Sequence, residues 1–144
     1  MAPSSVPVAH VLAALPERRQ AEAEELIAMM ASVTGEEAVV WAGKILGFGT
    51  YRYRYETGRE GIAPLVGFAP TPRHHTIYLV GDYQDRYPRL LAELPVDPEA
   101  RRGAPRFSKA CLYVPRLDAV RPEVLRKLVE RTARVSRGAD VSGS

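Results

Sequence analysis

The 144-residue sequence lacks most of the features that mark secreted, membrane-bound and metal-stabilised proteins. It contains one cysteine, Cys111, which excludes a disulfide framework and a zinc site built from several cysteines. No apolar run approaches the roughly 18 residues that a membrane-spanning helix needs. The N-terminal stretch MAPSSVPVAHVLAALP lacks the basic region and unbroken apolar segment of a signal peptide. We therefore expect a cytoplasmic protein with no membrane partner.

Motifs of nucleophilic, metal-dependent and nucleotide-dependent catalysis are also absent. The sequence contains no G-x-S-x-G, phosphate-binding loop, H-E-x-x-H or dinucleotide fingerprint. Cys111 lies two residues from Lys109, and a neighbouring ammonium can activate a thiol. A lone cysteine within a strand is more often a small buried hydrophobe. The sequence therefore predicts no catalytic residue and no enzymatic activity.

Charge is modest and mixed in sign. The net charge is +3, from 20 basic and 17 acidic residues. Dedicated nucleic-acid binders usually gather many basic side chains on one face, whereas here acidic residues lie among the basic ones. The composition therefore does not favour a nucleic-acid partner. It leaves a small molecule or another protein as the expected partner, and a monomer or a homodimer as the expected state.

Hydrophobic periodicity predicts four helices and five strands. The helices are expected at residues 4–15, 17–35, 82–95 and 121–135, and the strands at 37–43, 50–56, 62–69, 74–81 and 109–114. Short turns between consecutive strands favour antiparallel pairing. The expected fold class is α+β, an antiparallel sheet of about five strands with helices packed on one face. One domain would span residues 1–144, with a core from about 8 to 134 and a flexible tail at 136–144.

The clearest alternating segment is GFGTYRYRYETGREG at residues 47–61. On a strand, its three tyrosines share one face and its two arginines share the other. Arginines pointing at the helices would need buried carboxylate partners, which are costly. We therefore expect Tyr51, Tyr53 and Tyr55 to face the helices and Arg52 and Arg54 to stand on the open face of the sheet.

Other aromatic and cationic side chains on the predicted strands extend this open face. Together they can form a shallow ligand-binding surface, for which the candidate residues are Trp41, Arg52, Arg54, Tyr78, Lys109 and Tyr113. The alternative is that these side chains are ordinary strand residues that fill a small core. The sequence leaves both interpretations open.

Acidic residues offer a weak metal site as an alternative function. Hard cations prefer oxygen ligands, and the candidates are Glu22, Glu25, Glu36 and Glu37. Glu22 and Glu25 share a helix face because they are three residues apart. A solvated helix face explains the same acidic cluster without a metal. His74 and His75 are adjacent on a strand, so they point to opposite faces and cannot bind one metal together.

An ordered set of motifs covers most of the chain. It comprises LAALPERR, then Trp41 followed by GFGTYRYRY, TGREG, TIYLVG, KACLYV and RLDAVRPEVLRKLVE. In this order the set resembles the YdhG-like family of small bacterial domains. The resemblance implies a compact α+β domain with an antiparallel sheet and flanking helices. The family includes a frataxin-like iron chaperone, so the resemblance also implies weak iron binding as a possible activity.

The residues and the resemblance together predict a non-catalytic module that binds a small ligand or a protein. The alternative is a frataxin-like intracellular iron chaperone, in which oxygen ligands hold iron weakly. No cofactor is expected apart from that iron.

Overall fold

The computed structural model describes residues 1–142. The helices are α1 (Val8–Ala13), α2 (Glu17–Thr34), α3 (Tyr83–Arg86), α4 (Pro88–Glu93) and α5 (Pro122–Gly138), with a short 3-10 helix, η1, at Leu117–Ala119. The strands are β1 (Ala38–Trp41), β2 (Ile45–Phe48), β3 (Tyr51–Arg54), β4 (Glu60–Ala63), β5 (Val66–Pro70), β6 (His75–Tyr78), β7 (Arg106–Phe107) and β8 (Cys111–Val114).

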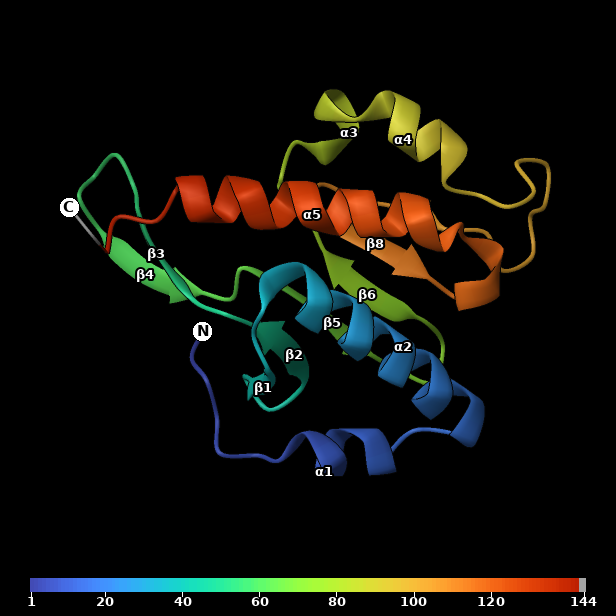
Figure 1. The fold of residues 1–144 in the computed structure, drawn as a ribbon, viewed down its shortest axis with the longest axis horizontal. Coiled ribbons are helices and arrows are strands. Elements are labelled where there is room, and N and C mark those ends of the chain that lie inside the picture. Colours follow the sequence, from blue (N-terminus) through green and yellow to red (C-terminus); the bar gives the residue numbers. More distant parts are fainter. Residues whose placement is uncertain (143–144) are drawn as a thin grey trace.

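Six of the strands form one antiparallel sheet, in the order β1-β2-β5-β6-β8-β7. Strands β3 and β4 pair separately as a hairpin. Helices α2 and α5 lie across the same face of the large sheet (Figure 1). The predicted α+β class and its antiparallel sheet are confirmed, although the described residues form eight strands where about five were expected.

Three segments account for the additional strands, because their hydrophobic periodicity does not indicate the strands that they form. All four residues of β2 are buried, so no polar alternation marks this strand. The segment predicted as one strand at 62–69 contains the end of β4 and most of β5, separated at Pro64 and Leu65. The segment at 96–108, between the predicted helix at 82–95 and the predicted strand at 109–114, contains the two-residue strand β7. The predicted helix at 82–95 divides into α3 and α4 because Tyr87 has a non-helical φ of −127° before Pro88.

The core lies between the large sheet and the two long helices. Leu26 and Met30 of α2 and Leu128 of α5 are fully buried against Phe48 and Phe68 of the sheet. Full burial of one such side chain contributes about 1.5–3 kcal/mol to stability. The residues that recur at three- and four-residue steps along both helices are buried or pack on the core: Ala23, Leu26, Ile27, Met30, Val33, Leu125, Leu128, Val129 and Thr132.

The tyrosine–arginine segment lies on a hairpin that extends past the ends of β2 and β5, beyond the large sheet (Figure 1). The register of β2 with β5, in which Leu46 faces Phe68, continues into that of β3 with β4, in which Tyr51 faces Ala63. Gly49, with a φ of +71°, interrupts the ladder where the two sheets meet. Strands β3 and β4 are therefore the far end of one long hairpin that leaves the sheet at this glycine.

The expected orientation of this segment is only partly correct. Arg52 and Arg54 are exposed, as predicted. The tyrosines, however, do not pack beneath the helices as a group. Tyr55 is 56% exposed, and the ring of Tyr53 lies over Gly61 of its own hairpin. Tyr51 alone approaches α5, where it lines a cavity of about 260 Å³ together with Thr132 and Val135.

The C-terminal segment contacts the same hairpin. Helix α5 continues to Gly138, so it includes residues that were assigned to the predicted tail at 136–144. Beyond it, Oδ1 of Asp140 accepts a hydrogen bond from the backbone N–H of Arg52 at 3.0 Å. The backbone N–H of Val141 donates to the carbonyl of Arg52 at 2.9 Å. Residues 143–144 of the predicted tail lie outside the described residues.

Trp41 packs against the strand beside it. A methyl group placed at Gly47 would lie 2.5 Å from Cδ1 of Trp41 and 2.8 Å from Cβ of Pro64, so the indole ring covers this glycine. The N-terminal segment closes the outer edge of β1, where Ser4 donates to the carbonyl of Val40 at 2.8 Å. As a result Trp41 is only 1% exposed.

We expect Gly47→Ala to destabilise the protein by about 1–3 kcal/mol, because the added methyl group overpacks the contact between Trp41 and Pro64. Urea unfolding followed by the fluorescence of Trp41, the single tryptophan, measures the change. Gly81→Ala is the matched control, since nothing lies within 4 Å of its added methyl group. Equal stability of the two variants would show that the indole ring of Trp41 does not pack closely over Gly47 of β2.

Candidate functional site

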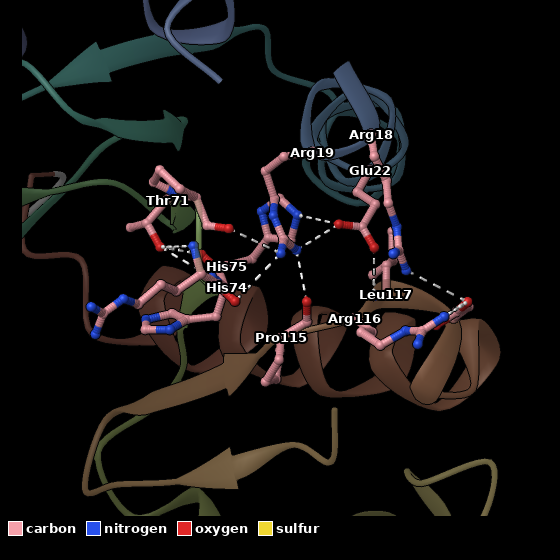
Figure 2. Close-up of polar contacts among 12 residues, drawn as sticks. Arg18, Arg19, Glu22, Thr71, His74, His75, Pro115, Arg116 and Leu117 are labelled. Carbon is pink, nitrogen blue, oxygen red and sulfur yellow. Dashed lines mark hydrogen bonds and ion pairs between the residues drawn. The ribbon is translucent and has the colours of Figure 1, made fainter. Parts of the chain in front are cut away.

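Three ionisable side chains form a buried cluster, the Arg19–Glu22–His75 network, beneath the first turns of α2. Glu22 is 9% exposed, so the expectation of a solvated acidic face is wrong for this residue. Its Oε2 accepts a hydrogen bond from the backbone N–H of Leu117 at 2.7 Å (Figure 2). Its Oε1 lies 2.6 Å from Nη1 of Arg19 and 3.3 Å from Nε2 of His75. The carboxylate therefore joins α2, β6 and the start of η1.

Arg19 extends the network to two further segments. Its Nη1 donates to the carbonyl of Pro115 at 2.8 Å, just after β8. Its Nη2 lies 3.4 Å from the carbonyls of Pro72 and Arg73, in the turn between β5 and β6. A buried charge is tolerated only when a counter-charge and hydrogen bonds compensate its lost hydration. These contacts provide that compensation and attach the first turns of α2 to the sheet.

His75 is fully buried on the helix-covered face, where its ring meets Phe68 at a centroid distance of 5.8 Å. His74 lies on the opposite face against Tyr113, which confirms that the two histidines point apart. Burial lowers the pKa of His75 to about 4, and the positive charge of Arg19 acts in the same direction, while Glu22 opposes both. At neutral pH the ring is therefore uncharged and donates from Nε2, because an ionised carboxylate can only accept. Its Nδ1 has no hydrogen-bond partner among residues 1–142.

A groove of about 470 Å³ adjoins this network, between α2 and the segment that leads into α5. We call it the α2–α5 groove. One wall is a single face of α2, formed by Arg18, Ala21, Glu22, Glu25, Leu26 and Met29, and the other consists of Val96, Leu117, Asp118, Val120, Pro122 and Leu125. At about 1.5 Å per residue, the helical wall is roughly 16 Å long. The hydrogen bond between Glu22 and Leu117 joins the two walls directly.

The charged groups around the groove differ in how they are paired. Asp118 lies 3.1 Å from Arg116 and 3.9 Å from Arg18, and its hydrogen bond with Arg116 lowers the pKa of its carboxyl group. Glu22 is neutralised by Arg19. Glu25 is exposed on the α2 wall, with no hydrogen bond or ion pair to any described residue. The groove therefore combines apolar walls with one unpaired carboxylate.

The candidate surface on the open face of the sheet is only partly assembled. Tyr78 packs against the small cluster that contains Trp41, but Trp41 itself is almost completely buried. Tyr113 lies between His74 and Arg106, with the guanidinium carbon 5.5 Å from its ring centre.

The remaining candidates of that surface lie outside these clusters. Lys109 is exposed in the turn between β7 and β8. Arg52 and Arg54 belong to the protruding hairpin, where Arg54 pairs with Glu60 at 3.4 Å. Cys111, expected to be buried, is only half-buried.

The candidate metal ligands do not form one cluster either. Glu22 and Glu25 do share the groove face of α2, as their spacing predicts, but both oxygens of Glu22 already accept hydrogen bonds. Glu36 and Glu37 are exposed beyond the end of the helix. Among residues 1–142, no group of three or more histidine, cysteine, aspartate and glutamate side chains is arranged to hold a metal ion.

One feature of the sequence, apart from its hydrophobic periodicity, points to the network. Arg19 and Glu22 form an oppositely charged pair at a three-residue spacing, which brings two side chains together on a helix. Glu22 also lies four residues before Leu26 and directly before Ala23, at the border of the apolar stripe. A charge pair at that border predicts a partly buried ion pair. His75 and Leu117 could not be inferred in this way, because they are 53 and 95 residues away from Glu22.

We expect Glu22→Gln to destabilise the protein by about 3 kcal/mol, because it leaves the guanidinium of Arg19 buried without its counter-charge. Urea unfolding measures the loss. Glu24→Gln is the matched control, because Glu24 is exposed on the same helix and its substitution should change stability by less than about 0.5 kcal/mol. Similar losses in both variants would contradict the structural role of Glu22.

The low pKa of His75 predicts a loss of stability in mild acid. Its folded value of about 4 lies below the ordinary value of 6.5, so the unfolded chain binds the proton first as the pH falls. The contribution of neutral His75 is complete above pH 6.5 and decreases by about 3 kcal/mol down to pH 4. We expect urea unfolding between pH 7 and 4 to show this slope in the wild-type protein. His75→Phe should lack that part of the slope, and parallel curves for the two proteins would refute the assignment.

Comparisons with known proteins give no relative. No family model matches the sequence, and neither a curated protein nor a solved structure matches it. Within the described residues, none of the helices combines the length and the apolar character required to cross a membrane.

Proposed function

We propose that the protein is a non-catalytic binding domain that holds a small, largely apolar molecule in the α2–α5 groove. The groove itself is the observation that carries this proposal. Its volume of about 470 Å³ lies within the roughly 300–1,000 Å³ of typical ligand sites. Its walls are mainly aliphatic, from Leu26 and Met29 on one side to Val120 and Leu125 on the other. Such a surface favours ligands that gain by leaving water.

The walls of the groove are fixed before any ligand binds. Glu22 joins α2 to Leu117, and Arg19 joins the same helix to Pro115. A ligand that enters a preformed site does not have to order the protein, so more of its contact energy contributes to affinity. The buried network therefore supports the proposal by holding the walls in place. Glu22 is the member of the network that also lines the groove.

The chemistry of the lining supports binding over catalysis. Among residues 1–142, no serine, cysteine, histidine or lysine lines the groove, so a nucleophile there would have to be a carboxylate. Both oxygens of Glu22 accept hydrogen bonds from protein groups. An acid–base mechanism needs a group that is free to exchange a proton with substrate. Glu25 is free, but the other two carboxylates of the lining, Glu22 and Asp118, are held in ion pairs with arginines.

The other predictions from the sequence remain proposals. A cytoplasmic location and membership of the YdhG-like family are consistent with an α+β binding domain. Iron chaperoning has no specific observation in its favour, because the four candidate glutamates do not converge on one point. A protein partner and a monomer or homodimer stay predictions.

Binding can be tested with protein labelled at its methionine methyl groups and titrated with 1-octanol. The chain has three methionines, of which Met29 lines the groove and Met30 is completely buried in the core. We expect octanol to shift the Met29 methyl resonance saturably and to leave Met30 nearly unchanged. Ala21→Phe should abolish the shift, because the ring fills the groove.

Ala28→Phe is the matched control, since Ala28 is an exposed alanine of the same helix outside the groove. It should bind octanol as the wild type does. An unchanged Met29 resonance, or equal binding by both phenylalanine variants, would refute the groove as a ligand site.

A further inference from the structure

We infer that the ligand of the α2–α5 groove is a cationic amphiphile, a molecule with an apolar chain and a protonated amine that pairs with Glu25. This inference rests on the proposed function and adds the chemical class of the ligand. It follows from the charges around the groove and from where the apolar wall lies relative to them.

The charged side chains of the lining determine which ligand charge fits the groove. The groove is lined by three carboxylates and one guanidinium, from Glu22, Glu25, Asp118 and Arg18. Two of the carboxylates are compensated, Glu22 by Arg19 and Asp118 by Arg116 and Arg18. Glu25 is the remaining charge, with no ion pair to any residue in the described part of the chain. Because Asp118 pairs with two guanidiniums, the preference for a cationic group is local to Glu25 and does not extend to the whole groove.

Glu25 lies on α2 away from the end of the groove where Arg18 pairs with Asp118. It lies seven residues after Arg18, so about 10 Å of helix separates it from the end of the groove where Arg18 and Asp118 pair. Leu26 and Met29 flank it on α2, and Val96, which is 49% exposed, lies on the opposite wall. A cationic head at Glu25 thus leaves an alkyl or aryl body within reach of apolar side chains.

Anionic and neutral ligands fit this lining less well than cationic ones. An anionic head would meet an unpaired carboxylate at Glu25 and a paired one at Asp118. Within the described part of the chain, Arg18 is the one basic side chain of the lining, and it already faces Asp118. A neutral amphiphile gains the apolar contacts but not the ion pair. The structure therefore ranks cationic above neutral, and neutral above anionic, for ligands with the same chain.

The inference is tested with 1-octylamine, 1-octanol and octanoate, three ligands with one chain length and different head charge at neutral pH. Each is titrated while the Met29 methyl resonance is followed. An exposed ion pair contributes up to about 1 kcal/mol, so we expect octylamine to bind about threefold to fivefold more tightly than octanol. Octanoate should bind more weakly than octanol. Added salt at about 1 M should reduce the preference, because it screens exposed charges.

Two variants identify the carboxylate. Glu25→Gln should abolish the preference, so that octylamine and octanol bind to this variant with the same affinity. Glu24→Gln, which removes the adjacent exposed carboxylate outside the groove, should preserve the preference. Equal binding of octylamine and octanol to the wild type, or a preference that survives Glu25→Gln, would overturn the inference while the groove remains a ligand site. Failure of all three ligands to shift Met29 would overturn both this inference and the proposed function.

Discussion

The carboxylate of Glu22 lies where three segments that are distant in sequence meet, and the geometry on this side of the protein depends on it. One oxygen accepts from the backbone of Leu117, and the other faces both Arg19 and His75. Burying such a group costs free energy, and a well-packed apolar replacement of a buried ion pair is often equally stable. The specific effect of the network is therefore orientation. It fixes α2 relative to η1, and the α2–α5 groove exists because these two walls are held apart and in place.

A second constraint acts at the opposite side of the sheet. The long hairpin that contains β2, β3, β4 and β5 keeps one register throughout but leaves the large sheet at Gly49. Beyond that point Ile62 still packs against the small cluster of Trp41, Ile45 and Ala69, but the outer part of the hairpin depends mainly on contacts outside the main core. Tyr51, Tyr53 and Tyr55 pack against one another with ring centres 6.1 and 5.2 Å apart, and Asp140 and Val141 bind the outer backbone of Arg52. The tyrosines thus stabilise a projecting hairpin.

What could be predicted from the sequence depended on how local the determining contacts are. The inward faces of α2 and α5, the strands β1, β6 and β8 and the opposite orientations of His74 and His75 follow from periodicity, which is a local property. Strand β2 was missed because a strand that is buried along its whole length has no polar alternation. The break of the hairpin at Gly49 and the burial of Glu22 depend on partners elsewhere in the chain. The groove could not be predicted because its two walls are about 90 residues apart in the sequence.

The expected binding surface was on the open side of the sheet, whereas the proposed groove lies on the side covered by α2 and α5. The packing of the aromatic residues explains this difference. Two of them cover glycines on neighbouring strands, Trp41 over Gly47 and Tyr53 over Gly61. A glycine in a strand has no side chain to pack, and an aromatic ring on the adjacent strand compensates for that deficit. In the sequence, a ring used in this way is indistinguishable from one that binds a ligand. Because these rings already have intramolecular partners, they add little free surface, whereas the aliphatic lining between α2 and α5 is accessible in a concave site.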